Sequence, residues 1–280
     1  MLDFSARVAG CKVFSKIDLR KGYYQIPMHP DDIRKTAICT PFGLFEFLRM
    51  PFGLRNAGNS FQRMMDRILA GLFFIFCYLD DIIIASRNEQ EHLEHLRIVF
   101  GRLRDAGLVI NAEKCIFAAA TVEFLGHKVS AAGVEPLRSH VQAVLAHPEP
   151  TCISELQAFL GTINFYRRFL PAAARILKPL TDLLIGGHKG TKPVSLADPQ
   201  RAAFVAAKHA LAAATHLAHP TQGYQLSLMV DASAEHIGGA LQQRQHKTDP
   251  WQPLGFFSRK LTSTQVKYSA FDRELLACFQ

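Results

Sequence analysis

The sequence lacks any close pairing of cysteines. Its six cysteines are scattered, with no two of them two or three residues apart, at positions 11, 39, 77, 115, 152 and 278. This spacing argues against a disulfide framework and against a zinc site of the usual kind. It predicts free thiols in a reducing compartment.

Long apolar segments are also missing. The longest apolar run, 72–79, is far shorter than the roughly 20 residues that a membrane-spanning helix needs. The first residues lack the apolar core of a secretory signal peptide. The 18 glycines and 14 prolines recur with no period, which excludes collagen-like and low-complexity chains. We therefore expect a soluble, intracellular protein with no membrane partner.

The chain does contain enough apolar residues for a sizeable core, together with an excess of positive charge. Hydrophobic residues make up 49% of its 280 residues, and this excludes a disordered polypeptide. At about 150 residues per domain, the length suggests two domains. The 32 basic residues outnumber the 24 acidic ones, which gives a net charge of +8 and favours a polyanionic partner.

Hydrophobic periodicity predicts a mixture of strands and helices. In residues 13–19 every second residue would lie on the same strand face, with Val13, Ser15, Ile17 and Leu19 on one face and Phe14, Lys16 and Asp18 on the other. Apolar residues in 61–69 recur at helical spacing. A later helix carries His92 and His95, whose spacing to the neighbouring glutamates is neither HExxH nor HxxEH. We expect these two histidines to lie on an exposed helix surface. The segment 186–200 is rich in glycine, proline and polar residues and is predicted to be a linker.

Two adjacent carboxylates, Asp80 and Asp81, follow the apolar run and precede a second one at 82–85. This pattern predicts two strands joined by an acidic tight turn, and a solvated hairpin turn would be sufficient to explain it. Asp18 also ends an apolar strand, and that strand can lie beside the hairpin. Three carboxylates on neighbouring strands repel one another unless cations neutralise them, and hard oxygen ligands select Mg²⁺ or Mn²⁺ over zinc. A pair of such ions is used for phosphoryl transfer.

Five motifs follow in order along the chain. They are FSKIDLRKGYYQI at 14–26, MPFGLRNAGNSFQ at 50–62, YLDD at 78–81, FLGH at 124–127 and FLGTINFYRRF at 159–169. In this order and spacing they closely resemble the reverse transcriptase of gypsy-type long-terminal-repeat retrotransposons. The resemblance covers nearly the whole chain.

The resemblance implies an α+β fold with a right-hand polymerase palm, an antiparallel sheet backed by helices. Residues 1–135 would form the palm with partial fingers, 136–185 a helical thumb, 186–200 the linker, and 201–280 a truncated ribonuclease H-like α/β domain. The family pattern has proline where Gly58 stands and a small residue where Asn59 stands, which concerns the entry to the next helix.

The resemblance also assigns roles in the polymerase site. Asp18, Asp80 and Asp81 would be the catalytic, metal-binding triad that holds two Mg²⁺ ions, with Mn²⁺ as a substitute. Residues that would contact the incoming nucleotide are Tyr23, as a gate against the 2′-hydroxyl, with Phe52 and Gly53. A core tyrosine is the alternative for Tyr23.

Primer and template contacts are implied for Tyr78 and for the hairpin Phe124, Leu125 and Gly126, which matches the primer grip. Arg167 and Arg168 lie on a basic helix of the predicted thumb, which would follow the phosphates. The alternatives are a purely structural hairpin and an ordinary solvated helix face.

The last third of the chain resembles the start of the ribonuclease H domain that follows this polymerase, in the motifs 228–233, 238–241 and 271–277. Asp231 and Glu274 match the first two of the four metal-binding carboxylates of that domain. Because the chain stops before the other two and begins shortly before Asp18, we expect an internal fragment or a decayed copy of a longer polyprotein.

The expected function is RNA-directed DNA polymerisation, with RNA template, DNA primer, RNA–DNA hybrid and deoxynucleoside triphosphates as partners. A catalytically silent nucleic-acid-binding relic is the alternative, and a metal-dependent ribonuclease H is a further one. The expected location is a cytoplasmic retrotransposon particle or the nucleus. The sequence does not indicate an oligomeric state.

Overall fold

The computed structural model describes residues 2–187 and 189–280, which divide into two compact units. The first unit extends to Leu125 and includes Val129–Ala131. The second comprises Gly126–Lys128 and Ala132–Gln280. Among the described residues, no helix is both long and apolar enough to cross a membrane.

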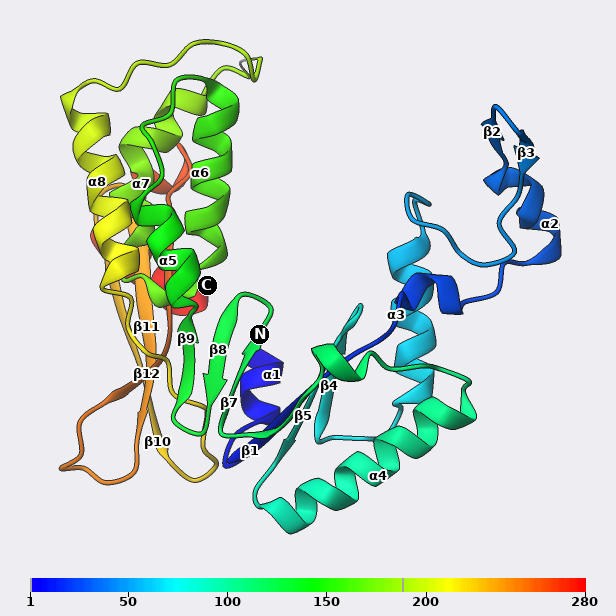
Figure 1. Ribbon diagram of the computed structural model, residues 1–280. Coiled ribbons are helices and arrows are strands. Elements are labelled where there is room, and N and C mark those ends of the chain that lie inside the picture. Colours follow the sequence, from blue (N-terminus) through cyan, green and yellow to red (C-terminus); the bar gives the residue numbers. More distant parts are fainter. Residues whose placement is uncertain (1, 188) are drawn as a thin grey trace. The chain divides into compact units, whose positions relative to one another are not determined.

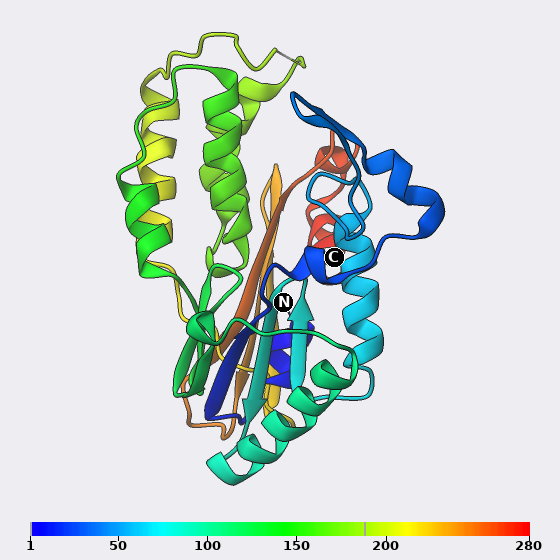
Figure 2. The ribbon, with the colours of Figure 1, turned by 45° about the vertical axis from the view of Figure 1, so that its right-hand side comes forward.

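The first unit is built on a four-stranded antiparallel sheet, in the order β4-β5-β1-β6. Its strands are β1 (Val13–Asp18), β4 (Ile75–Tyr78), β5 (Asp81–Ser86) and β6 (Ile116–Ala119). Helices α3 (Ala57–Ile68) and α4 (Glu89–Asp105) lie beside the sheet (Figure 2). This is the helix-backed antiparallel sheet that the resemblance predicts.

Both faces of this sheet are buried. This explains why the sequence of the central strand β5 is an almost continuous apolar run. Ile82 and Ile84 of β5 pack with Phe61 of α3 in one core. Ile83 packs with Phe124 in a second core on the other face, which also receives α1 (Leu2–Arg7). Because successive strand residues point to opposite faces, one isoleucine run supplies both cores.

Smaller elements complete the first unit. The hairpin β2 (Ile38–Thr40) and β3 (Gly43–Phe45) forms a separate two-stranded sheet near α2 (Pro30–Ile33). Three single turns of 3-10 helix are η1 (Gly22–Gln25), η2 (Arg34–Thr36) and η3 (Ala112–Lys114). Of the next three strands, β7 (Thr121–Phe124) belongs to the first unit, β9 (Gly133–Pro136) belongs to the second, and β8 (His127–Ser130) has residues in both.

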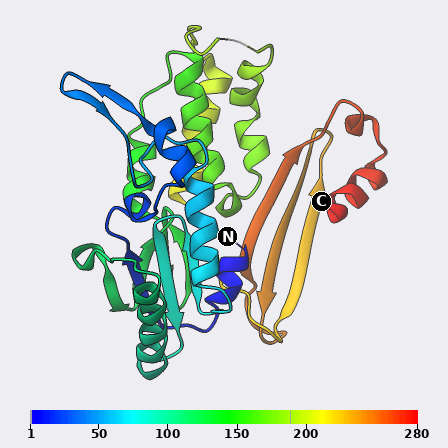
Figure 3. The ribbon, with the colours of Figure 1, turned by 90° about the vertical axis from the view of Figure 1, so that its right-hand side faces the viewer.

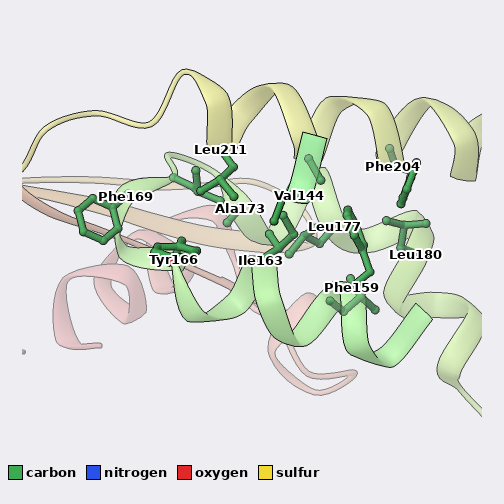
Figure 4. Close-up of a cluster of buried hydrophobic side chains, with 14 of the residues drawn as sticks. Val144, Phe159, Ile163, Tyr166, Phe169, Ala173, Leu177, Leu180, Phe204 and Leu211 are labelled. Atoms are coloured by element: carbon green, nitrogen blue, oxygen red, sulfur yellow. The ribbon is translucent and has the colours of Figure 1, made fainter. Parts of the chain in front are cut away.

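The second unit begins with helices that run side by side (Figure 1). They are α5 (Arg138–Leu145), α6 (Ile153–Phe165), α7 (Ala173–Thr181) and α8 (Asp198–Ala212), with η4 (Arg167–Phe169) and η5 (Asp182–Leu184) between them. Their facing side chains, among them Phe159, Leu177 and Phe204, form one apolar core (Figure 4).

A three-stranded antiparallel sheet follows in the same unit. Its strands β10 (Gln225–Ala232), β11 (His236–Arg244) and β12 (Gln252–Lys260) pair in sequence order. After η6 (Gln265–Lys267), α9 (Ala270–Phe279) packs beside β10 and β11 (Figure 3).

The structure bears on two expectations from the sequence, one about the segment 186–200 and one about His92, and it contradicts the second. The segment 186–200 does not separate two compact units, because Leu196 is buried and α8 packs on α5 and α7 through Phe204 and Leu211. His92 is not on an exposed surface, since only 1% of it is accessible. Its ring nitrogens bond to the hydroxyls of Ser15 and Ser86, and these partners are distant in sequence or outside the helix, so periodicity could not reveal them.

Candidate active site

Asp18 and Asp81 lie directly opposite each other on the neighbouring strands β1 and β5. Opposed residues of an antiparallel pair project from the same face of the sheet. Lys16, two residues before Asp18, shares that face, and its Nζ lies 2.9 Å from Oδ1 of Asp81. Two of the three predicted ligands are therefore neighbours, and a lysine already neutralises one of them.

Asp80 lies in the tight turn that joins β4 to β5. The register pairs Tyr78 with Asp81, so the two turn residues are Leu79 and Asp80. This confirms the predicted hairpin but places Asp81 on the strand. The turn is half-buried, and Oδ1 of Asp80 is buried with no hydrogen-bond partner among the described residues, which a fully solvated turn would not show.

The charge of Asp80 is poorly compensated. Burial, followed by the negative charges of Asp18 and Asp81, raises the pKa of the Asp80 carboxyl above its ordinary value. The pKa of the neighbouring Cys77 thiol is raised to about 12, chiefly by burial, then by Asp66, and then by Asp80 and Asp81. Burial is the main cause of both shifts, and the nearby carboxylates add to it.

The carboxylate oxygens of this arrangement and their negative charge both suit divalent cations. Three carboxylates come from β1, the β4–β5 turn and β5, and Oδ1 of Asp80 has no hydrogen-bond partner within the part of the chain that the structure describes. The carboxylates are not gathered in advance, since no group of three acidic, histidine or cysteine side chains within the described residues is close enough to hold a metal.

Tyr23 and Phe52, both predicted to contact the nucleotide, lie against each other near Asp80. The ring of Tyr23 is edge-on to Phe52, with 5.4 Å between centroids, and edge-on to Phe61 at 5.3 Å. Its phenol pKa is raised by burial and then by the charge of Asp80. Phe52 is 64% exposed, and Gly53 after it has a φ of 88°. Tyr23 therefore packs on the core residue Phe61 and also lies beside the candidate site, next to Phe52 and Asp80.

The predicted primer and template contacts divide between exposed and buried residues. Tyr78 is 52% exposed at the end of β4, whereas Phe124 is 1% exposed and stacks on Phe4. Leu125 and Gly126 form the β7–β8 turn with φ values of 44° and 75°. Because Phe124 points into the core, contact between this hairpin and nucleic acid would have to come from its backbone or turn residues.

Arg167 and Arg168 do not line an exposed basic helix face. Both are half-buried in η4, and burial lowers the pKa of each guanidinium. Arg167 donates a hydrogen bond to the carbonyl of Ser258, and Arg168 donates to the carbonyl of Leu254 at 3.3 Å. These bonds hold η4 against β12, so the structure favours a packing role over the predicted phosphate contact.

Asp231 and Glu274 come close together in the second unit. Asp231 lies on β10 opposite Gly238, and Oε1 of Glu274 accepts a hydrogen bond from the backbone N–H of Ala232 at 3.2 Å. Both side chains are exposed. The structure therefore brings these two predicted ligands to neighbouring positions.

Three residues near the site were not singled out from the sequence. Alternation along the strand already puts Lys16 on the face of Asp18, but the sequence did not indicate its ion pair with Asp81. Gly22 is buried beside Asp80, and Gln62 of α3 contacts the β4–β5 turn. No local pattern signals these two contacts, because they join segments far apart in the chain.

Comparison with known families decides the identity of the chain. Residues 2–129 match the family described as reverse transcriptase (RNA-dependent DNA polymerase), and residues 196–280 match the RNase H-like domain found in reverse transcriptase. The chain belongs to the reverse transcriptase family.

Its relatives among curated proteins are parts of transposon polyproteins. The reverse transcriptase chain is 40% identical over 283 residues to the retrovirus-related Pol polyprotein from transposon 297 of Drosophila melanogaster, covering 99% of this chain and 26% of that protein. It is 34% identical over 274 residues to the transposon Tf2-3 polyprotein of Schizosaccharomyces pombe, covering 97% and 20%. It thus spans about a quarter of the length of these relatives.

Solved reverse transcriptases share the fold. A foamy viral protease–reverse transcriptase in complex with double-stranded DNA matches with a TM-score of 0.87 and 24% identity, over 99% of this chain and 48% of that one. A foamy viral protease–reverse transcriptase with an RNA/DNA hybrid matches with a TM-score of 0.84 and 25% identity, over 99% and 37%. The fold expected from the sequence motifs is confirmed.

Proposed function

We propose that this reverse transcriptase chain catalyses RNA-directed DNA synthesis, in which a primer 3′-hydroxyl is joined to an incoming deoxynucleoside triphosphate. One observation carries the proposal. Asp18 is opposite Asp81 on neighbouring strands, Asp80 lies in the adjoining β4–β5 turn, and Oδ1 of Asp80 is buried with no hydrogen-bond partner among the described residues. Carboxylates on adjoining segments of this kind are the ligands that phosphoryl-transfer sites use.

The group that these three carboxylates would hold is a pair of Mg²⁺ ions, for which Mn²⁺ is the substitute. Carboxylate oxygens are hard ligands, and their mutual repulsion favours cation binding. When bound, such ions supply Lewis acidity toward the attacking hydroxyl and neutralise the phosphate oxygens. The chain's own contribution is to supply these carboxylates from the neighbouring strands β1 and β5 and from the β4–β5 turn.

The aromatic residues beside Asp80 would select and orient the nucleotide. We assign to Tyr23 a steric contact with the ribose that excludes a 2′-hydroxyl, because its ring is held by Phe52 and Phe61. Phe52 and Gly53 are exposed next to it and would contact the incoming base and the template. Tyr78, exposed at the end of β4, would contact the primer.

The proposed partners are an RNA template, a DNA primer and the hybrid that they form. Foamy viral relatives at 25% identity were solved with double-stranded DNA and with an RNA/DNA hybrid, and this supports nucleic-acid partners for the present chain. The net charge of +8 also favours a polyanion. We further propose that Asp231 and Glu274 serve as metal ligands of a ribonuclease H-type site.

A nucleic-acid-binding relic without polymerase activity is the second candidate. Two observations favour it. Within the described part of the chain the three carboxylates are not close enough to form a ready metal site, and Asp81 is engaged by Lys16. Under this alternative the chain binds hybrid but adds no nucleotides.

The test is primer extension on an RNA template by the 280-residue chain with Mg²⁺, in parallel with Asp80→Asn. We expect extension by the parent, its loss when EDTA removes the metal, and a fall of about 100-fold or more in Asp80→Asn. The variant should remain folded, because removing the Asp80 charge relieves repulsion from Asp18 and Asp81. Asp105→Asn, at the exposed end of α4, is the matched control and should match the parent.

Two outcomes would contradict the polymerase proposal. Hybrid binding by the parent without any incorporation would support the relic instead. Extension by Asp80→Asn at the parental rate would remove Asp80 from the chemistry.

A further inference from the structure

The side-chain amide of Gln62 holds the turn that carries Asp80. Its Oε1 accepts a hydrogen bond from the backbone N–H of Leu79 at 2.7 Å, and its Nε2 donates to the carbonyl of Cys77 at 3.0 Å. Nε2 also donates to Oδ1 of Asp66, one helical turn further along α3, at 2.9 Å. One amide on α3 therefore contacts the backbone on both sides of Tyr78.

Only one orientation of this amide satisfies all three partners. The Cys77 carbonyl and the Asp66 carboxylate both need an N–H donor, whereas the Leu79 N–H needs an acceptor. Asp66 thus fixes which end of the Gln62 amide faces which part of the turn. Gln62 is half-buried and Asp66 is exposed, so the pair reaches from the surface of α3 to the hairpin.

The turn needs such support for two reasons. β4 is an edge strand, paired only with β5, so its outer N–H and carbonyl groups have no neighbouring strand. Leu79 has a φ of 51°, in the left-handed region that costs a non-glycine residue about 1 kcal/mol or more. The Gln62 amide presents one acceptor and one donor, as the backbone of a further strand would, and so favours this strained conformation.

We infer that Gln62 is a positioning residue for Asp80, oriented by Asp66. Asp80 directly follows Leu79, so the backbone that Gln62 holds sets the direction of the Asp80 carboxylate. The expected effect of Gln62 on the reaction rate rests on the proposed polymerase function. The expected effect on the backbone of the turn does not rest on that function.

The kinetic test compares Gln62→Met, of similar length without the amide, with the parent in primer extension. We expect kcat to fall by about 10- to 100-fold, the scale on which small misplacements of a reacting group act. The Mg²⁺ concentration for half-maximal rate should rise. The KM for the nucleotide and the affinity for hybrid should change by less than about threefold, because the Gln62 amide is bonded to the β4–β5 turn and to Asp66.

Two further variants separate positioning from a general loss of folding. Gln62→Glu keeps an acceptor for the Leu79 N–H but loses the donor to Cys77 and adds charge beside Asp66, so it should be impaired like Gln62→Met. Gln90→Met removes a glutamine that is exposed on α4 and bonds only weakly to Glu94, and it should match the parent. A Gln62→Met variant with parental kcat and Mg²⁺ dependence would overturn the inference. So would a loss of rate without any change in Mg²⁺ dependence.

Hydrogen exchange of the Leu79 amide tests the structural part independently of activity. In the parent this N–H is bonded to Gln62 and should be protected, and in Gln62→Met its exchange should be about tenfold or more faster. Gln90→Met should exchange like the parent. Equal exchange in the parent and Gln62→Met would overturn the inference even if the parent is an active polymerase. If the Leu79 amide exchanges faster in Gln62→Met but the parent extends no primer, the positioning role of Gln62 stands and the polymerase proposal is rejected.

Discussion

At the scale of single residues, Gly22 shows how closely the backbone approaches the candidate active site. A Cβ at this position would lie 2.7 Å from Oδ1 of Asp80 and 3.0 Å from the ring of Phe61. The first of these neighbours carries a buried, partly uncompensated charge, and the second is fully buried in the core. Neither neighbour can move away without disturbing the site. Glycine is therefore required at position 22 because there is no room for a Cβ.

We expect Gly22→Ala to lower the free energy of unfolding by about 1–3 kcal/mol, as overpacking of a core does, and to reduce primer extension. Gly101→Ala is the matched control. Gly101 lies within α4 with no atom within 4 Å of the added Cβ, so alanine should stabilise the protein by about 0.5–1 kcal/mol. Chemical denaturation of both variants measures the difference, and equal stabilities would contradict the close approach.

At the scale of elements, a buried hydrogen-bonded network ties α4 to the sheet. Nε2 of His92 lies 2.6 Å from Oγ of Ser15 on β1, and Nδ1 lies 2.7 Å from Oγ of Ser86 on β5. The Ser86 hydroxyl also contacts Nδ1 of His95 at 2.8 Å. Each ring nitrogen of His92 has a hydroxyl partner, so the neutral imidazole is satisfied without charge.

This network predicts a pH dependence of stability. Burial and then the nearby His95 lower the pKa of His92 below its ordinary value of 6.5, whereas the charge of Glu91 acts in the opposite direction. Because the folded protein disfavours the protonated ring, the contribution of His92 is complete above pH 6.5. It is lost as the pH falls from there toward the lowered pKa of the folded state.

Unfolding of the parent and His92→Gln by denaturant between pH 5 and 7.5 tests this expectation. The variant should be less stable at pH 7.5 by about 1–3 kcal/mol, because a buried hydroxyl loses its partner, and its stability should depend less on pH below 6.5. His209→Gln, exposed on α8, is the control and should retain the parental pH profile. If the stability of His92→Gln depends on pH in the same way as that of the parent, groups other than His92 cause the pH dependence.

At the scale of the whole molecule, the net charge of +8 predicts salt-dependent binding of nucleic acid. The structure changes which residues can be responsible. Arg167 and Arg168 were expected on the phosphate-binding face, yet both donate hydrogen bonds to carbonyls of β12. Their charges stabilise packing inside the second unit.

We therefore expect the double variant Arg167→Gln and Arg168→Gln to lose stability while keeping the salt dependence of hybrid binding. The slope of log K against log salt concentration should stay within about 0.5 of the parental slope, measured by fluorescence anisotropy between 50 and 200 mM salt. If the two guanidinium groups bind phosphates, the slope should become shallower by about 2. That result would support the phosphate contacts that the sequence predicts for Arg167 and Arg168.

Local patterns in the sequence were sufficient for much of the architecture. Alternation at 13–19 and the apolar runs around the acidic pair predicted β1, β4 and β5, and helical spacing predicted α3. These signals suffice because the face that a residue occupies depends on its immediate neighbours along the chain. The ordered motifs then identified Asp18, Asp80 and Asp81 as the candidate site.

Only the tertiary structure decided how that site is supported. Gly22 makes room for Asp80, Gln62 holds the turn from a helix, and Arg167 bonds to a strand 91 residues away. It also placed α8 against the helices that precede it in the chain. Such contacts depend on which faces pack together and on how much space remains between them, and periodicity along the chain carries neither quantity.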